Sequence, residues 1–288
     1  MSLTAEQKAE RIKHLGSSDM AAVLGVDPWR TPTDVWLEKT DRLIERPASA
    51  VMDAGSRFEG GVLDWAEEQL GPLQRNVVLS DLIGGSPLVS RVDALAARSG
   101  GEPVEAKTGG LLGPLAEWWG EEGTDQVPER VVVQCHVHMI CADVGSCHVP
   151  TFLGGRGFAM FQVPRHEGLA AAIREKAREF WQEYVLSDTQ PPDSQPSLAV
   201  AKYIRRIPDR ITDVDPALVQ RWLLAKEAAA DAKTDAEEAA AEILAAMGEA
   251  EAARAGEMGG VTYFQTNRKG FTTEPTSFRT LRYRKKGL

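Results

Sequence analysis

The sequence predicts an α/β (α+β) protein in which a central mixed β-sheet is flanked by helices, followed by a helical and basic C-terminal extension. Two observations indicate this class. Short strand-like runs alternate with segments of helical periodicity as far as residue 190, and a proline-rich segment then precedes a stretch dominated by Ala and Glu. The length of 288 residues suits one large domain with an appendage.

Capping and stop signals place the helices of the first part. Pro32 suits the first turn of a helix over residues 32–39, and Gly71-Pro72 ends a helical pattern over residues 50–70. The same criteria predict the remaining helices at residues 5–15, 20–24, 128–141 and 166–186.

Strand-like runs fill the space between these helices. Gly154-Gly155-Arg156 joins the last two runs as a hairpin turn, and Arg98-Ser99-Gly100-Gly101 forms an earlier turn. The predicted strands are residues 76–79, 88–95, 103–108, 145–153 and 157–163.

Composition divides the chain into three parts. Residues 1–190 form the predicted α/β domain, residues 191–198 a proline-rich linker, and residues 199–288 the extension. Within the extension, residues 215–255 predict one helix or a helical hairpin, followed by a small hairpin of residues 260–265 and 271–273 and a basic tail.

Charge and cysteine content limit the class of protein. The net charge of −9 excludes binding of nucleic acid by bulk attraction, so any such contact must be local. Three cysteines do not make a disulfide framework, and the most apolar stretch, residues 131–153, is too polar to span a membrane. We therefore expect a cytoplasmic protein that does not enter membranes.

Two carboxylates and an ammonium group converge in the predicted sheet. If the hairpin is centred near Ser99 and Gly100, Asp93 lies about 5 Å across from Glu105 or Ala106. Glu105 and Lys107 are two residues apart and share one face of their strand. Such a group suits Mg²⁺, with Lys107 orienting a water molecule for attack on a phosphodiester; an exposed hairpin with a Glu/Lys pair is the alternative.

Two further polar residues lie on predicted helices. Glu59 shares a helix face with small and apolar residues, where a carboxylate needs a cation or a salt bridge such as one to Arg57. Gln134 lies one turn into the helix that starts at Pro128, where its amide either orients a water molecule or metal ligands or forms a hydrogen bond at the core edge.

A series of motifs resembles a known family. The run from Gly16 to Gly25, then Pro28-Trp29-Arg30-Thr31-Pro32, resembles the amino-terminal signature of YqaJ-type viral recombinase nucleases, which are relatives of phage lambda exonuclease in the PD-(D/E)XK superfamily. The order continues with Glu59, Asp93, Glu105-x-Lys107 and Gln134, so the resemblance spans about residues 11 to 193.

The resemblance implies a PD-(D/E)XK nuclease core and a metal-dependent 5′→3′ exonuclease that acts on double-stranded DNA ends and leaves 3′ single strands for recombination by annealing. Mg²⁺ is the implied cofactor, with Mn²⁺ as a substitute. Asp93, Glu105 and the carbonyl of Ala106 would bind the metal. Glu59 would bind a second metal or lie in the outer shell of the first. Lys107 would position the nucleophilic water, and Gln134 would complete the site.

The same resemblance implies how the substrate is held. Arg11 and Ser18, seven residues apart, would grip the 5′-phosphate together with the neighbouring Ser17. A single-strand annealing protein is the implied partner, and a ring-shaped trimer the implied assembly. Two competing functions stay open: a structure-specific endonuclease on the same fold, and a non-catalytic DNA-binding scaffold of recombination.

Overall fold

The computed structural model describes residues 9–45, 47, 49–81, 86–110 and 118–265. It divides the chain into two units, residues 1–205 and residues 206–288. The boundary therefore falls after Arg205, rather than at the proline-rich segment 191–198 that the composition favoured.

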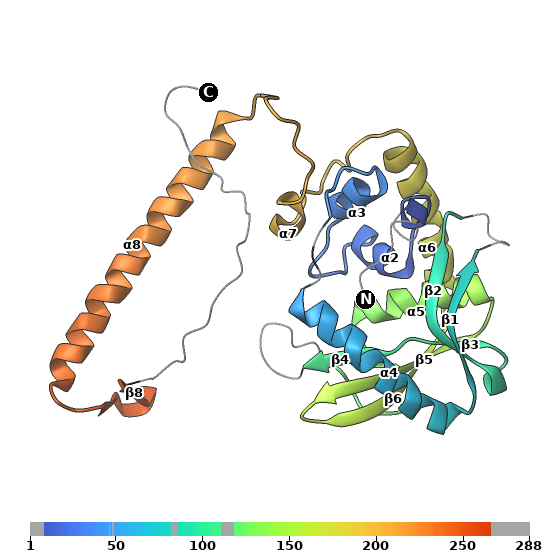
Figure 1. Ribbon diagram of the computed structural model, residues 1–288, viewed down its shortest axis with the longest axis horizontal. Coiled ribbons are helices and arrows are strands. Elements are labelled where there is room, and N and C mark those ends of the chain that lie inside the picture. Colours follow the sequence, from blue (N-terminus) through green and yellow to red (C-terminus); the bar gives the residue numbers. More distant parts are fainter. Residues whose placement is uncertain (1–8, 46, 48, 82–85, 111–117, 266–288) are drawn as a thin grey trace. The chain divides into compact units, whose positions relative to one another are not determined.

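The first unit is built on a mixed sheet (Figure 1). β1 (Leu73–Ser80) pairs antiparallel with β2 (Val89–Ala96), which pairs antiparallel with β3 (Glu102–Val104). β5 (Ser146–Gly154) runs parallel to β3 and to β4 (Lys107–Gly110), and β6 (Gly157–Pro164) is antiparallel to β5. The predicted α+β class with a central mixed sheet is confirmed.

The predicted strand 103–108 is interrupted in its middle. β3 and β4 pair with β5 in one continuous register, because Val104 lies opposite His148 and Lys107 opposite Thr151. Between them, Glu105 and Ala106 have no strand geometry. The two strands are thus one strand broken at the position where the sequence predicted the carboxylates to converge.

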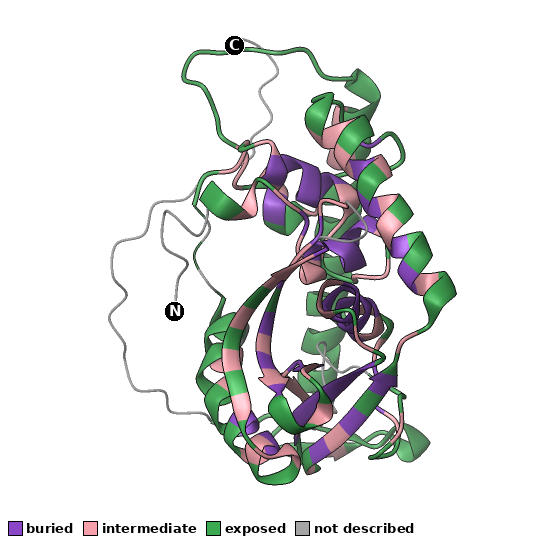
Figure 2. Ribbon diagram, turned by 90° about the vertical axis from the view of Figure 1, so that its right-hand side faces the viewer, coloured by how far each residue is buried: buried purple, intermediate pink, exposed green. Residues whose placement is uncertain are grey.

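Helices cover both faces of this sheet. α4 (Ala50–Leu70) contributes Leu63 and Ala66 to a cluster with Ala94, Ala96 and Val104. α5 (Glu129–Ala142) packs against the opposite face, since its cluster contains residues of β5 and β6 that alternate with those facing α4. Nearly all of β5 is buried, whereas buried residues alternate with more exposed ones along β6; Figure 2 shows such an alternation on strands of the sheet.

The remaining helices form a third cluster with α5. Its members are α2 (Ser17–Val23), α3 (Pro32–Lys39), α6 (Glu167–Phe180) with a π-helical turn (Trp181–Leu186), and α7 (Leu198–Ala201). Most predicted helices keep their bounds within a few residues. The helix predicted over residues 5–15 was wrong at its C-terminal end, since the helix ends at residue 11, a turn follows and Leu15 forms a β-bridge to Leu88; residues 1–8 lie outside the described part.

As far as residue 265, where its described part ends, the second unit consists of α8 (Pro216–Met247) and a hairpin of β7 (Ala252–Arg254) and β8 (Gly260–Thr262), with a 3-10 turn (Gly256–Met258) between the two strands. Of the two predicted arrangements for residues 215–255, the single helix is correct, but it ends earlier, at Gly248, whose φ of 56° lies in the left-handed region. Residues 260–262 pair with residues 252–254, a pairing that the sequence did not predict, and the predicted partner 271–273 lies outside the described range.

Candidate active site

Asp93 and Glu105 meet at the break between β3 and β4. Ala94 lies opposite Val104 in the β2–β3 ladder, so the next antiparallel pair is Asp93 and Glu105, as the hairpin geometry predicted. The Asp93 side chain accepts a hydrogen bond of 2.8 Å from the backbone N–H of Ala106. The Asp93 side chain thus replaces the backbone carbonyl that would accept from the Ala106 N–H in a regular β-ladder. The strand is interrupted at this point.

Glu105 is held at both carboxylate oxygens. Oε1 lies 2.5 Å from Nζ of Lys107, and Oε2 lies 2.9 Å from Nε2 of His138 on α5. The Glu105 side chain is 9% exposed and that of Lys107 15% exposed. The predicted convergence of the two carboxylates with Lys107 is therefore present.

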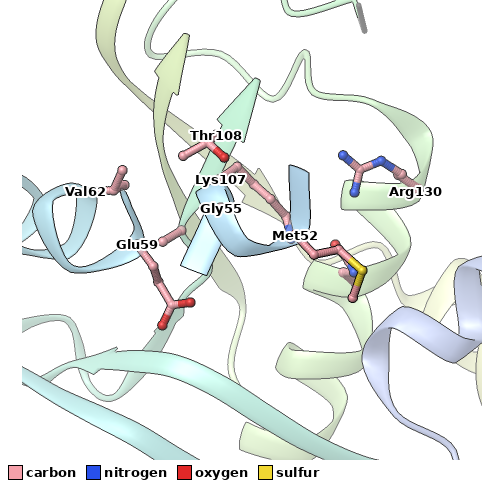
Figure 3. A pocket seen from close by; sticks show the side chains of 9 residues that line it. Met52, Gly55, Glu59, Val62, Lys107, Thr108 and Arg130 are labelled. Carbon is pink, nitrogen blue, oxygen red and sulfur yellow. The ribbon is translucent and has the colours of Figure 1, made fainter. Parts of the chain in front are cut away.

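A cavity of about 440 Å³ opens beside this break, between α4 and α5 (Figure 3). Its wall includes four predicted site residues, Glu59, Ala106, Lys107 and Gln134, whereas Asp93 and Glu105 are not part of its lining. The full lining is Met52, Gly55, Glu59, Val62, Ala106, Lys107, Thr108, Arg130 and Gln134.

Glu59 enters this cavity from α4. The alternative that the sequence left open, a salt bridge to Arg57, is not found, because Arg57 pairs instead with Asp53 at 2.8 Å. Among the residues the structure describes, no ion pair is formed by Glu59. Glu59 is half-buried and is one of the residues that line the cavity; Figure 3 shows its side chain leaving α4.

Gln134 enters from α5 and is nearly buried, at 8% exposure. Its Oε1 atom is buried and has no hydrogen-bond partner within the described residues. A buried amide oxygen without a partner is costly, so this one requires a ligand or a water molecule to complete its bonding.

The pKa values of Asp93 and Glu105 are shifted in opposite directions. Burial, and then repulsion by Glu105, raise the pKa of Asp93 well above its usual range. Burial also opposes the charged form of Glu105, but Lys107 and His138 outweigh it and lower the pKa of Glu105. For Lys107 the attraction of Glu105 likewise outweighs burial and raises the pKa. Lys107 therefore does not fully offset the negative charge that Glu105 and Glu59 place beside Asp93.

The donor set fits a hard divalent cation. Asp93, Glu105 and the Ala106 carbonyl supply oxygen atoms of the kind that Mg²⁺ binds, and the raised pKa of Asp93 and the unpartnered Gln134 oxygen both mark a place where a hydrated cation would be accommodated. Within the described ranges, however, no three His, Cys, Asp or Glu side chains are gathered as a preformed metal cluster. Two carboxylates, a carbonyl and water molecules are the ligands available.

The predicted phosphate-binding residues lie in the N-terminal helices. Ser17 and Ser18 begin α2, and the next residue, Asp19, is buried and pairs with Lys39 at 2.6 Å. Lys39 also donates to the backbone carbonyl of Arg11 at 2.9 Å. This buried lysine therefore brings the backbone of Arg11 and the start of α2 to the same place, although the Arg11 guanidinium lies 3.4 Å from Glu38.

Two residues of the site region did not follow from the sequence. His138 contacts Glu105, and Arg130 lines the cavity while lying 5.0 Å over the ring of Trp29. The available signal was helical spacing, since Arg130 and His138 lie one turn before and one turn after Gln134 and therefore share its side of α5.

Comparison with known proteins gives a family match. Residues 7–145 match the model of the YqaJ-like viral recombinase domain. The chain is also 26% identical over 256 residues to the uncharacterized protein YqaJ of Bacillus subtilis, covering 84% of this chain and 77% of that one.

Some solved structures with a similar arrangement are described as exonucleases. LHK-Exo, an alkaline exonuclease of Laribacter hongkongensis, matches with a TM-score of 0.47 and 12% identity, covering 64% of this chain and 94% of that one. A phage-related exonuclease of Haemophilus somnus matches with a TM-score of 0.45 and 10% identity over 63% of this chain and all of that one. Separately, no helix in the described residues is long and apolar enough to cross a membrane.

Proposed function

We propose that this chain, whose residues 7–145 match the YqaJ-like viral recombinase domain, is a metal-dependent exonuclease that digests double-stranded DNA from its ends. The observation that carries the proposal is the meeting of Asp93, Glu105 and Lys107 at the strand break, beside a cavity that Glu59 and Gln134 also line. Phosphodiester hydrolysis needs oxygen ligands for a cation, a group that orients water, and a recess for the phosphate, and these three elements are adjacent here.

Each residue has a separate task in this proposal. Asp93, Glu105 and the Ala106 carbonyl hold Mg²⁺, for which Mn²⁺ can substitute, and the cation supplies charge stabilisation at the scissile phosphate. Lys107, whose raised pKa keeps it an ammonium, donates a hydrogen bond that orients the attacking water. Glu59 binds a second cation or its water molecules, and Gln134 presents its unpartnered oxygen to the same water network.

The finer features follow from the resemblance of the motifs. We propose that digestion runs 5′→3′, that Arg11, Ser17 and Ser18 hold the 5′-phosphate, and that the 3′ single strand passes to a single-strand annealing protein. Contact of Arg11 with Lys39 and of Lys39 with Asp19 supports the placement of these residues around one site. A ring-shaped trimer is the assembly we propose for continuous digestion.

The test is digestion of linear duplex DNA with a 5′-phosphate, with and without Mg²⁺, by the wild type and by Lys107→Ala. We expect Mg²⁺-dependent release of nucleotides by the wild type and a loss of about 10²- to 10⁴-fold in rate for the variant. A wild type that is inactive with both Mg²⁺ and Mn²⁺, or a fully active Lys107→Ala, would exclude the mechanism.

Covalently closed supercoiled DNA separates the competing functions. An enzyme that needs an end leaves this substrate intact, whereas a structure-specific endonuclease on the same fold nicks it. A non-catalytic scaffold binds linear DNA but releases no nucleotides from it. Asp53→Asn, which alters a surface ion pair with Arg57, is the matched control and retains wild-type rates.

A further inference from the structure

His138 is a buried histidine in direct contact with the candidate site. It lies on α5 one turn after Gln134 and is 0% exposed. Its Nε2 atom is 2.9 Å from Oε2 of Glu105, and its Nδ1 atom forms a hydrogen bond with Oγ of Ser90. Ser90 is on β2, three residues before Asp93, and is also fully buried.

The chemistry of these partners fixes the direction of both hydrogen bonds. An ionised carboxylate only accepts, so Nε2 of His138 carries the proton and donates to Glu105. In the neutral imidazole Nδ1 is then an acceptor, and the Ser90 hydroxyl is the group able to donate to it. Ser90 therefore selects the tautomer that presents an N–H group to Glu105.

With this bond in place, the Glu105 carboxylate is fixed in its plane. Lys107 holds one oxygen and His138 the other, and the two come from different elements, β4 and α5. Lys107 lies only two residues after Glu105 in the sheet, whereas His138 belongs to α5, which packs on the sheet. His138 is therefore the contact that connects the Glu105 carboxylate to this helix. Groups that orient a metal-binding side chain in this manner change metal affinity without touching the metal.

We propose that His138, oriented by Ser90, is a positioning residue that holds Glu105 in the orientation required to bind the divalent cation. The inference rests on the proposed function for its consequence in catalysis, but its direct consequence is cation affinity. A merely structural histidine would stabilise the fold and leave cation affinity unchanged.

The chain contains a matched control for this contact. Nε2 of His148 lies 2.8 Å from Oε2 of Glu102, which gives the same pair of groups at nearly the same distance in the same sheet. Neither residue lines the cavity beside Lys107. Replacing the His148 side chain thus removes a partly buried His–Glu hydrogen bond without removing a side-chain contact of the Glu105 carboxylate.

The experiment measures Mn²⁺ binding to the full chain by calorimetry in the absence of DNA, together with the Mg²⁺ dependence of DNA cleavage. We expect His138→Leu to weaken Mn²⁺ binding by about 10- to 100-fold and to shift the Mg²⁺ concentration for half-maximal cleavage upward by a similar factor. His138→Gln, which keeps an N–H donor, restores most of the affinity, and His148→Leu, which removes the His148–Glu102 hydrogen bond, leaves it at the wild-type value.

Ser90→Ala keeps the test decisive if His138→Leu does not fold, because the imidazole stays in place and loses only its orienting partner. We expect several-fold weaker Mn²⁺ binding in this variant, with a cooperative thermal transition. Wild-type Mn²⁺ affinity in a folded His138→Leu would overturn the inference, and so would wild-type Mn²⁺ affinity in Ser90→Ala if His138→Leu does not fold. A wild type that binds Mn²⁺ but cleaves no DNA would instead overturn the proposed function and leave the positioning role standing.

Discussion

Asp93 accepts the backbone N–H of Ala106 at 2.8 Å, so one side chain both interrupts the strand and lies at the candidate cation site. The same position makes it unfavourable as an anion, because burial and then repulsion by Glu105 raise its pKa. The break in the strand and the unfavourable burial of a charge therefore both come from the Asp93 carboxylate. The cost of burying this charge can be measured as a loss in the free energy of unfolding.

We predict that Asp93→Asn stabilises the metal-free protein while abolishing cleavage. Asn keeps an oxygen for the Ala106 N–H group and removes the charge, and each unit of pKa shift corresponds to about 1.4 kcal/mol. Because the pKa of Asp93 is raised on folding, the folded state holds its proton more tightly, and stability falls as pH rises above the ordinary value near 3.8. The advantage of the variant in melting temperature should be absent below that pH and grow toward neutrality.

Mg²⁺ should reverse this order of stability. A ligand that binds only the folded state raises its stability, so we expect the melting temperature of the wild type to rise with Mg²⁺ at pH 7 and that of Asp93→Asn to stay constant. Thermal melts at several Mg²⁺ concentrations check this. Equal Mg²⁺ responses of the two proteins would show that Asp93 is not a ligand.

Gln134 gives a second separation of stability from activity. Its Oε1 atom is buried without a partner among the described residues, so we predict that Gln134→Leu is neutral or stabilising, by at most about 1–2 kcal/mol, while the cleavage rate falls. Denaturant unfolding and single-turnover cleavage measure the two effects. A clear loss of stability in this variant would mean that the amide is a structural hydrogen-bonding group.

The strands and helices of residues 17–186 could be predicted because their signals are local. Pro32 marks the start of one helix and Gly71 the end of another, and the turn at Ser99 and Gly100 places Asp93 opposite Glu105 or Ala106, of which the observed register selects Glu105. His138 could not be found in this way, since its contact with Glu105 spans 33 residues and depends on how α5 packs on the sheet. The early end of α8 was missed because the Ala-rich pattern continues past Gly248, and only its positive φ stops the helix.

Arg11 provides a prediction on substrate ends. We expect Arg11→Ala to lose the preference for 5′-phosphate over 5′-hydroxyl ends, since a charge-assisted hydrogen bond contributes about 1.5–3 kcal/mol. Arg11→Lys should recover only part of it, because the planar fork of the guanidinium is lost. Competition between the two kinds of duplex end gives the ratio, and a wild type that shows no preference would remove Arg11 from the site.

Replacing Glu38 should strengthen the preference for 5′-phosphate ends, whereas replacing Arg11 should weaken it. Its Oε1 atom lies 3.4 Å from Arg11, and its Oε2 atom lies 2.9 Å from Arg30. Glu38→Gln removes the carboxylate that competes with a phosphate for Arg11, so we predict several-fold tighter binding of 5′-phosphorylated ends. Arg11→Ala in the same background is the control, and it should cancel the gain.

Asp19 and Lys39 form a buried ion pair that supports the start of α2. The side chains are each 1% exposed and 2.6 Å apart. Removal of one partner leaves a buried charge, so Asp19→Asn should cost about 3–5 kcal/mol of stability. The double variant Asp19→Asn with Lys39→Met should be more stable than Asp19→Asn alone. Urea unfolding of the wild type and both variants measures the differences. A wild-type free energy of unfolding in Asp19→Asn would show that the ion pair does not contribute to folding.

The last prediction concerns where the first unit ends. Residues 191–205, which include the proline-rich stretch, are hydrogen-bonded to α3: Thr33 Oγ1 donates to the carbonyl of Ser194, and the N–H of Ser197 donates to Asp34. Val200 is 3% exposed in the cluster of α2, α3 and α6. These contacts belong to the fold of the first unit.

A chain that ends after Arg205 should therefore unfold cooperatively, whereas one that ends after Gln190 loses these contacts. Loss of the buried Val200 side chain and of the hydrogen bonds to Ser194 and Ser197 predicts a destabilisation of several kcal/mol, since a buried aliphatic side chain alone contributes about 1.5–3 kcal/mol. Thermal and urea unfolding of the two shortened chains compare them directly. Equal stability of the two would place the boundary at the proline-rich segment, because residues 191–205 would then add nothing to the fold.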